Sequence, residues 1–182
     1  RTERKNDMSR IELKHIDKFY GSNHVLRDIN LTIEDGDFMT LLGPSGCGST
    51  AKLANQIIVN LTIAAVSEAL VLATKAGADP EKVYQAIRGG LAGSTVLDVK
   101  APMMLARNFV PGGKISINLK DIKNVMSSAH AMDVPLPLTA QLLEIMQSLK
   151  VGGHLDDDHA GIVQYFERLA GVEVRAGETG GV

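Results

Sequence analysis

The stretch from Ser49 to Ala76 contains neither proline nor glycine, and Gly77 follows it as a predicted C-cap. At 1.5 Å per residue, a helix of this length extends about 40 Å. Apolar side chains occupy more than one of its faces, which is typical of a helix that several others cover. Polar residues interrupt its most apolar part, Ile57 to Ala73, so we interpret it as a buried helix and expect no membrane insertion. The segment predicts a helical bundle around one long central helix.

Helix start and stop signals follow one another through the rest of residues 49–174. Asp79 before Pro80 is typical of a helix start, because Asp caps free N–H groups and proline fits the first turn. Gly-Gly pairs at 89–90 and 152–153 interrupt the pattern. The expected helices run from Pro80 to Arg88, from Ser94 or Thr95 to about Asn108, from Ser116 or Asn118 to about Met132, from Leu138 to Leu149, and through Ile162–Leu169 after the acidic run Asp156–Asp158.

Residues 9–48 have a different pattern, which is typical of strands. Ile29, Leu31 and Ile33 alternate with polar residues. Turn residues occur before this stretch at 21–23 and after it at 34–37. The apolar run Phe38–Leu42 predicts a further, buried strand. A unit of this size is too short to bury a core of its own. We therefore predict a mainly α fold, with a bundle preceded by a small antiparallel β unit and with flexible tails at 1–8 and 175–182.

The composition narrows the function classes. The chain has 182 residues and a formal net charge of -2, so no general attraction to nucleic acid or anionic lipid is expected. Its single cysteine, Cys47, allows no internal disulfide, which fits a reducing compartment. The first residues are charged and no apolar segment of a signal peptide follows them. We expect a cytoplasmic protein.

A glycine-rich loop, Gly43-Pro-Ser-Gly-Cys-Gly48, has the spacing of a P-loop and stands between a predicted strand and a predicted helix. Backbone N–H groups of such a loop cradle phosphates. The lysine that would reach the phosphates is absent, because Ser49 follows Gly48 directly. The candidate phosphate-binding residues are Gly43, Ser45, Gly46, Gly48, Ser49 and Thr50.

The motifs Lys18-Phe-Tyr-Gly21, Val25–Leu31, Glu34–Asp37 and Leu42–Gly48 occur in that order before the helical segment. This order resembles the beginning of an ABC transporter ATP-binding subunit. The resemblance implies that Tyr20 would stack on adenine. The later signature and Walker B motifs of that family do not occur in this sequence, so we expect neither ATP hydrolysis nor tight ATP binding.

A second set of motifs begins at the same loop. It comprises Lys52-Leu-Ala-Asn-Gln56, Ser67-Glu-Ala-Leu70, Val83–Ser94, Leu119-Lys-Asp-Ile122 and Leu136-Pro-Leu-Thr139. Together they resemble the C-terminal helical domain of the β-hydroxyacid dehydrogenases, in particular the tartronate semialdehyde reductase (2-hydroxy-3-oxopropionate reductase) and 3-hydroxyisobutyrate dehydrogenase branches. The implied fold is the helical bundle seen in the C-terminal part of 6-phosphogluconate dehydrogenase. The resemblance covers residues 49–174.

The resemblance also implies roles for individual residues. Lys52 would be the catalytic acid/base, placed near the start of the long helix where a cation can stabilise charge on a carbonyl oxygen. Asn55 and Gln56 share its helical face and would bind the substrate, a small 3-hydroxyacid or semialdehyde. Lys120 and Asp121 would lie by the cofactor, NAD or NADP. The helical domain would form a homo-oligomer.

The nicotinamide cofactor of this family is held by an N-terminal Rossmann domain with a Gly-x-Gly-x-x-Gly turn, which this sequence does not contain. We therefore expect this chain alone not to bind NAD(P) and to be inactive, acting at most as an oligomerisation module. An ABC-type ATP-binding protein with a defective P-loop is the alternative. We interpret Gly43–Gln56 as the junction of two truncated pieces.

Two histidines, His154 and His159, flank the acidic run Asp156–Asp158. Their spacing does not match a zinc site, and we expect no metal. Acidic residues in the first turn of a helix favour its dipole. We therefore interpret the run as the solvated, capped start of the last helix.

Overall fold

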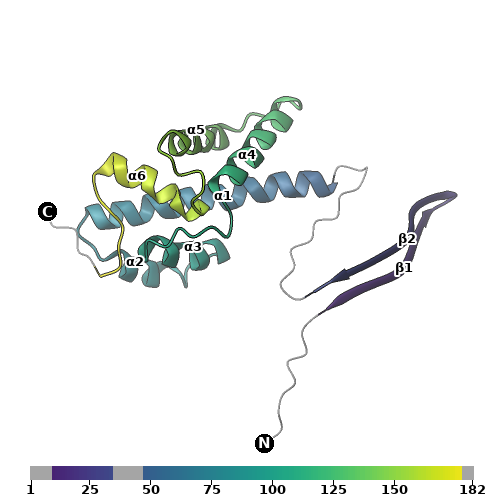
Figure 1. Cartoon of the computed structure of the whole chain (residues 1–182), viewed down its shortest axis with the longest axis horizontal. Helices are drawn as coiled ribbons and strands as arrows, with labels where there is room; N and C mark the ends of the chain where they lie inside the picture. Colours follow the sequence, from purple (N-terminus) through teal and green to yellow (C-terminus); the bar gives the residue numbers. More distant parts are fainter. Residues whose placement is uncertain (1–9, 35–46, 178–182) are drawn as a thin grey trace, which may run out of the picture. The chain divides into compact units, whose positions relative to one another are not determined.

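The computed structural model describes residues 10–34 and 47–177 (Figure 1). The chain divides into two compact units, Arg1–Gly48 and Ser49–Val182. The elements are β1 (Ile11–Tyr20), β2 (Asn23–Ile33), α1 (Cys47–Lys75), α2 (Pro80–Ile87), α3 (Thr95–Leu105), α4 (Ile115–His130), α5 (Pro137–Val151), the short 3-10 helix η1 (His159–Ile162) and α6 (Val163–Ala170). The prediction of a mainly helical fold with a small antiparallel β unit is confirmed.

The first unit contains a β-hairpin. Strands β1 and β2 pair antiparallel from Ile11 opposite Ile33 to Tyr20 opposite Asn23, and the turn between them begins at Gly21. Gly21 has a φ of 60°, which glycine adopts without steric cost. None of the hairpin's described apolar side chains is buried, and several, including Ile11 and Phe19, are exposed, so the described hairpin has no core of its own. The turn predicted after Glu34 and the strand predicted at 38–42 lie outside the described residues, as do the first tail and most of the last.

Helix α1 runs the length of the second unit, with α2 and α3 drawn below it and α4, α5 and α6 above it in Figure 1. Ile63 and Leu70 of α1 are fully buried, and they belong to one hydrophobic cluster with residues of all the other helices. Among the described residues, only the Thr50–Lys75 part of α1 is long and apolar enough to span a membrane, and 44% of its most apolar window is buried. The complete burial of Ile63 and Leu70 within the shared cluster agrees with the interpretation of α1 as the core helix of the bundle.

Local capping chemistry explains where two of the shorter helices begin. The carboxylate of Asp79 accepts a hydrogen bond from Glu81 N (3.0 Å), and the hydroxyl of Ser94 accepts one from Leu97 N (3.0 Å). Both helix starts confirm the sequence prediction. The start predicted at Ser116 or Asn118 was wrong: α4 begins at Ile115, and its N-cap residue, Lys114, makes no side-chain cap.

The turn between α2 and α3 is closed tightly at Gly93. Gly93 N donates to Gly90 O (2.9 Å), and a Cβ atom at Gly93 would lie 2.2 Å from Arg88 O. Arg88 itself lies over the ring of Tyr84, and both side chains donate hydrogen bonds to Asp98 Oδ1 (3.1 Å each). Contacts between α2, α3 and their turn therefore depend on a close backbone approach that only glycine permits.

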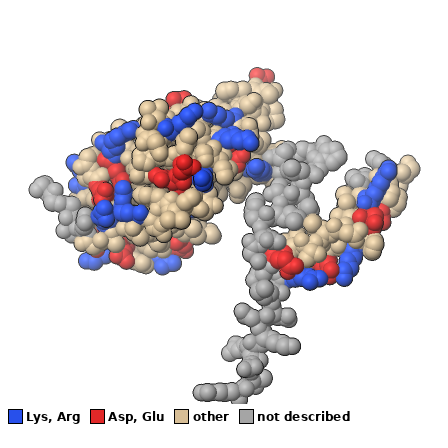
Figure 2. All heavy atoms as spheres, in the orientation of Figure 1, with Lys and Arg blue, Asp and Glu red and all other residues tan. Residues whose placement is uncertain are grey.

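Charges of both signs are interspersed over the face of the helical unit that Figure 2 shows. Neither sign gathers over a large area of that face. This mixed pattern accords with the small net charge of -2.

Candidate functional site

The first turns of α1 and the beginning of α4 bring three predicted site residues together. Lys52 Nζ lies 3.6 Å from Asp121 Oδ1, and Gln56 Nε2 donates to Asp121 Oδ2 over 2.5 Å. Lys52 and Gln56 are one turn apart on α1, so both side chains can reach the same carboxylate on α4. The side chain of Asp121 is 14% exposed, whereas that of Lys52 is 50% exposed. A half-exposed amine is thus held by a nearly buried carboxylate.

The other two predicted dehydrogenase residues are adjacent in sequence to members of this cluster. Asn55 and Lys120 are both exposed. Asn55 lies three residues after Lys52 on the same helix, a spacing that places the two side chains on neighbouring positions of one face. Lys120 directly precedes Asp121 on α4. The exposure of both side chains is compatible with ligand binding, and their roles toward substrate and cofactor stay predictions.

The predicted phosphate-binding loop cannot be described in the same way. Gly43, Ser45 and Gly46 lie outside the described residues, and the side chains of Tyr20 and Ser49 are not described. Gly48 and Thr50 lie in the first turn of α1, where Thr50 is exposed. The phosphate-binding role of all these residues stays a prediction.

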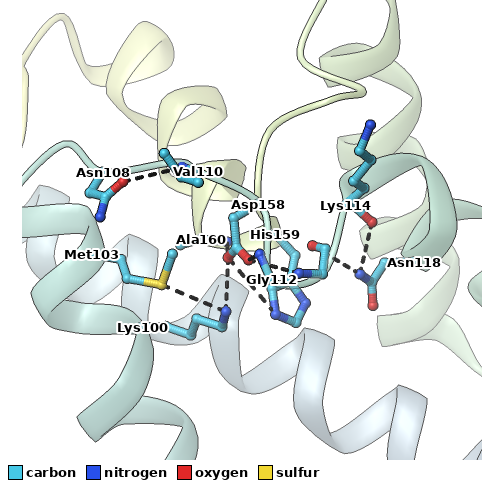
Figure 3. A network of polar contacts seen from close by, with 11 residues as sticks. Lys100, Met103, Asn108, Val110, Gly112, Lys114, Asn118, Asp158, His159 and Ala160 are labelled. Atoms are coloured by element: carbon cyan, nitrogen blue, oxygen red, sulfur yellow. Dashed lines mark hydrogen bonds and ion pairs between the residues drawn. The ribbon is translucent and has the colours of Figure 1, made fainter.

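A second polar cluster, centred on Asp158, was missed by the sequence interpretation (Figure 3). The Asp158 carboxylate accepts hydrogen bonds from Lys100 Nζ (2.8 Å), Ala160 N (2.9 Å), Gly112 N (2.9 Å) and Gly113 N (3.0 Å). Its side chain is fully buried and that of Lys100 is 12% exposed. The interpretation of the acidic run as solvated was therefore wrong for Asp158, because its partners come from α3 and from the loop before α4. The carboxylate ties these segments to η1.

The environment of this cluster fixes its charges. Burial alone would raise the pKa of Asp158, but hydrogen bonds from Ala160 N, Lys100 and Gly113 N hold that pKa below its ordinary value. Burial lowers the pKa of the neighbouring His159 to about 4, and the positive charge of Lys100 acts in the same direction. At neutral pH the Asp158 side chain is therefore a carboxylate and the His159 imidazole is uncharged. Among the described residues, no group of three or more His, Cys, Asp or Glu side chains is arranged to hold a metal ion.

Comparison with known proteins gives consistent matches for the helical unit. Residues 46–166 match a family model described as the NAD-binding domain of NADP-dependent 3-hydroxyisobutyrate dehydrogenase. Over 135 residues the chain is 46% identical to 2-hydroxy-3-oxopropionate reductase of Escherichia coli K12, covering 74% of this chain and 46% of the relative. A probable mitochondrial 3-hydroxyisobutyrate dehydrogenase-like protein of Arabidopsis thaliana is 34% identical over 141 residues, which are 78% of this chain and 42% of the relative.

Solved structures agree with this assignment. The crystal structure of 3-hydroxyisobutyrate dehydrogenase from Salmonella typhimurium superposes with a TM-score of 0.63 at 27% identity, covering 65% of this chain and 42% of that one. The chain thus spans about half the length of the relatives it matches. Since the family model covers most of the chain and includes Lys52, Gln56 and Asp121, this protein belongs to the family of the NADP-dependent 3-hydroxyisobutyrate dehydrogenase NAD-binding domain.

Proposed function

We propose that residues 49–174 are the substrate-binding and catalytic helical part of an NAD(P)-dependent 3-hydroxyacid dehydrogenase of the 2-hydroxy-3-oxopropionate reductase type. The observation that carries the proposal is the half-exposed Lys52 ammonium group, anchored 3.6 Å from Asp121. The 46% identity to the Escherichia coli reductase supports this substrate class. The substrate would be a small 3-hydroxyacid or the matching semialdehyde.

The chemistry assigned to Lys52 follows from its position. Reduction of a carbonyl leaves negative charge on its oxygen, which an ammonium group within hydrogen-bond distance stabilises and then protonates. In the oxidation direction the neutral amine takes the hydroxyl proton. Half of the Lys52 side chain is exposed and can reach a ligand, while Asp121 restrains it from the other side. The exposed carboxamide of Asn55, on the same helical face, would hydrogen-bond the substrate.

The residues present also fit a nicotinamide cofactor at this edge of the bundle. Lys120 is exposed beside Asp121, and its ammonium group is a donor suited to a polar or anionic part of NAD or NADP. When bound, the nicotinamide supplies or accepts the hydride. Lys52 would donate or accept the accompanying proton.

We further propose that this chain alone has no dehydrogenase activity and acts at most as a homo-oligomerisation module. The 182 residues contain no Gly-x-Gly-x-x-Gly turn, which is the element that holds the dinucleotide in a Rossmann domain. The test is to mix the chain with NADH or NADPH and 2-hydroxy-3-oxopropionate and to follow absorbance. Oxidation of either coenzyme would contradict the proposal. Light scattering would test the oligomer, and a monomer would count against it.

A chimera tests the catalytic role of Lys52 directly. Residues 49–174 would replace the matching part of the Escherichia coli reductase, whose own N-terminal half would supply the cofactor domain. We expect reductase activity that falls at least about 100-fold on Lys52→Ala, since general acid–base catalysis contributes 10²–10⁴-fold. Lys75→Ala, at the exposed far end of α1, is the matched control and should leave activity unchanged. Equal effects of the two substitutions would refute the role of Lys52.

The second candidate function is ATP binding of the ABC transporter type by residues 9–48, which we propose are derived from the beginning of such a subunit. Its support is the glycine spacing of Gly43–Gly48 and the order of motifs before it. Titration calorimetry with Mg-ATP separates the two functions. Saturable binding in the micromolar range would favour this second candidate; we expect none, because the P-loop lysine is absent.

A further inference from the structure

Behind the Lys52–Asp121 pair, a line of side chains continues into the core along α1. Asn60 lies one turn after Gln56, as Gln56 lies one turn after Lys52. Asn60 Nδ2 donates to Gln56 O (2.9 Å) and to Gln56 Oε1 (3.3 Å), and Gln56 Nε2 donates in turn to Asp121. Two amides therefore link a fully buried core position to the carboxylate that holds Lys52.

The direction of every hydrogen bond in this line is set by the charge on Asp121. An ionised carboxylate only accepts, so Gln56 must present its NH₂ group to it. The Gln56 carbonyl oxygen then faces Asn60, which must present its own NH₂ group. Reversing either amide would place oxygen against oxygen. The line has one consistent arrangement, and both polar ends of Gln56 are used within it, which favours a positioning role over the predicted role in substrate binding.

Asn60 is a destabilising choice of residue for a core position. It is fully buried, and its Oδ1 atom has no hydrogen-bond partner among residues 10–34 and 47–177. A buried polar atom without a partner is destabilising. A serine or threonine could donate the same hydrogen bond to the Gln56 carbonyl without leaving a buried amide oxygen unpaired. Ser67 on the same helix donates in this way to the carbonyl four residues earlier (2.7 Å). What the asparagine adds is its second hydrogen bond, the one to the Gln56 side chain.

We propose that Gln56 and Asn60 are positioning residues: they lock the Asp121 carboxylate, and through it restrain Lys52 for its proton transfer. The catalytic purpose rests on the proposed function, but the mechanical link does not. Asn60 fixes the Gln56 amide, that amide fixes one oxygen of Asp121, and the other oxygen faces Lys52.

Reactivity of the Lys52 amine in the full chain tests this link without any hydride transfer. A limiting amount of an acetylating N-hydroxysuccinimide ester would be added, and acetylation at Lys52 would be measured by mass spectrometry relative to the exposed references Lys75 and Lys82. Asp121→Asn, which removes the ion pair, should raise relative acetylation of Lys52 about two- to fivefold, the upper part of the range measured for solvent-exposed ion pairs.

Three variants behind Asp121 decide the proposal. Gln56→Met removes the donor at similar size, Asn60→Leu removes both bonds of Asn60, and Asn60→Ser keeps a bond to Gln56 O but loses the bond to its side chain. We expect all three to raise Lys52 acetylation at least about twofold while helix content and the reference lysines are unchanged. Wild-type reactivity of Lys52 in Asn60→Ser would overturn the role of Asn60, since only its local backbone bond would then matter.

Unchanged reactivity in Gln56→Met or Asp121→Asn would overturn the link as a whole. Failure of the proposed function would show in the activity of the chimera, independently of the acetylation of Lys52. An inactive chimera combined with the expected acetylation changes would retain the restraint on Lys52 and reject its dehydrogenase role. An active chimera with unchanged acetylation in the variants would retain the dehydrogenase role of Lys52 and reject its restraint through Gln56 and Asn60.

Discussion

Removal of the Asp158 carboxylate should be among the most damaging single changes to the helical unit. Asp158→Ala leaves three backbone N–H groups without an acceptor, those of Gly112, Gly113 and Ala160. It also leaves the Lys100 ammonium group, with a 12% exposed side chain, without its partner. Breaking a buried ion pair from one side costs about 3–5 kcal/mol, and each unsatisfied buried donor adds about 1–3 kcal/mol.

Water entering the vacated space would satisfy some of these donors, so we expect a total loss of about 5 kcal/mol. That loss is comparable with the whole stability of a small domain, about 5–15 kcal/mol. Urea unfolding followed by far-UV circular dichroism measures it. With a slope of about 1–3 kcal/mol per M, the midpoint should fall by roughly 2 M or more.

Two further variants make the result interpretable. Asp156→Ala, two residues earlier, removes a carboxylate that is 87% exposed and paired with Lys114 at the surface, and should leave the midpoint nearly unchanged. Lys100→Met combined with Asp158→Ala removes the unpaired charge and should recover part of the loss. If Asp158→Ala is no more damaging than Asp156→Ala, then the carboxylate does not hold the segments together and the reasoning is refuted.

Three other predictions concern local features of the bundle. Gly93→Ala should destabilise the unit by about 1–3 kcal/mol, because the new Cβ would meet Arg88 O at 2.2 Å; Gly89→Ala, where no atom lies within 4 Å, is the control in the same urea assay. Ser94→Ala should cost about 1 kcal/mol through loss of the N-cap of α3, and an unchanged midpoint would contradict that. The folded-state pKa of His159 is lowered from an ordinary 6.5 to about 4, so the unfolded chain binds the extra proton: stability should be full above about pH 6.5 and fall as the pH drops toward 4. His159→Gln should flatten the pH dependence of stability in this range. The same slope in the variant and the wild type would contradict the assignment to His159.

Local signals in the sequence predicted local structure well. Asp79 and Ser94 cap helices in the structure because a side-chain oxygen and a backbone N–H two or three residues later are within reach wherever the helix lies. The start of α4 was misjudged because no side chain caps it; backbone hydrogen bonds from Ile115 N to Asp157 O and from Ser116 N to Leu155 O hold it instead. Those partners are distant in the chain, so no local pattern shows them.

For the candidate site too, the sequence predicted some features and only the packing of the helices decided the others. Lys52, Asn55 and Gln56 were predicted as site residues from the family resemblance together with their helical spacing, and Lys120 and Asp121 from the resemblance alone. Their spacing could not show that the Asp121 carboxylate lies against Lys52 and Gln56, because these residues are brought together only by the packing of α1 and α4. Asn60 gave no signal, since α1 is apolar on most faces and the buried face could not be chosen from sequence.

The sequence by itself determined the helical class, the long central helix, the starts of α2 and α3 and the family motifs, because these depend on spacing within one or two turns. Tertiary structure alone decided which polar residues are buried and which groups satisfy them. Asp158 reads as one of three adjacent acids, yet it is the one that is fully buried, since α3 and the loop before α4 fold over it and supply its donors. Desolvation and long-range hydrogen bonding are properties of the packed chain, and no single segment carries them.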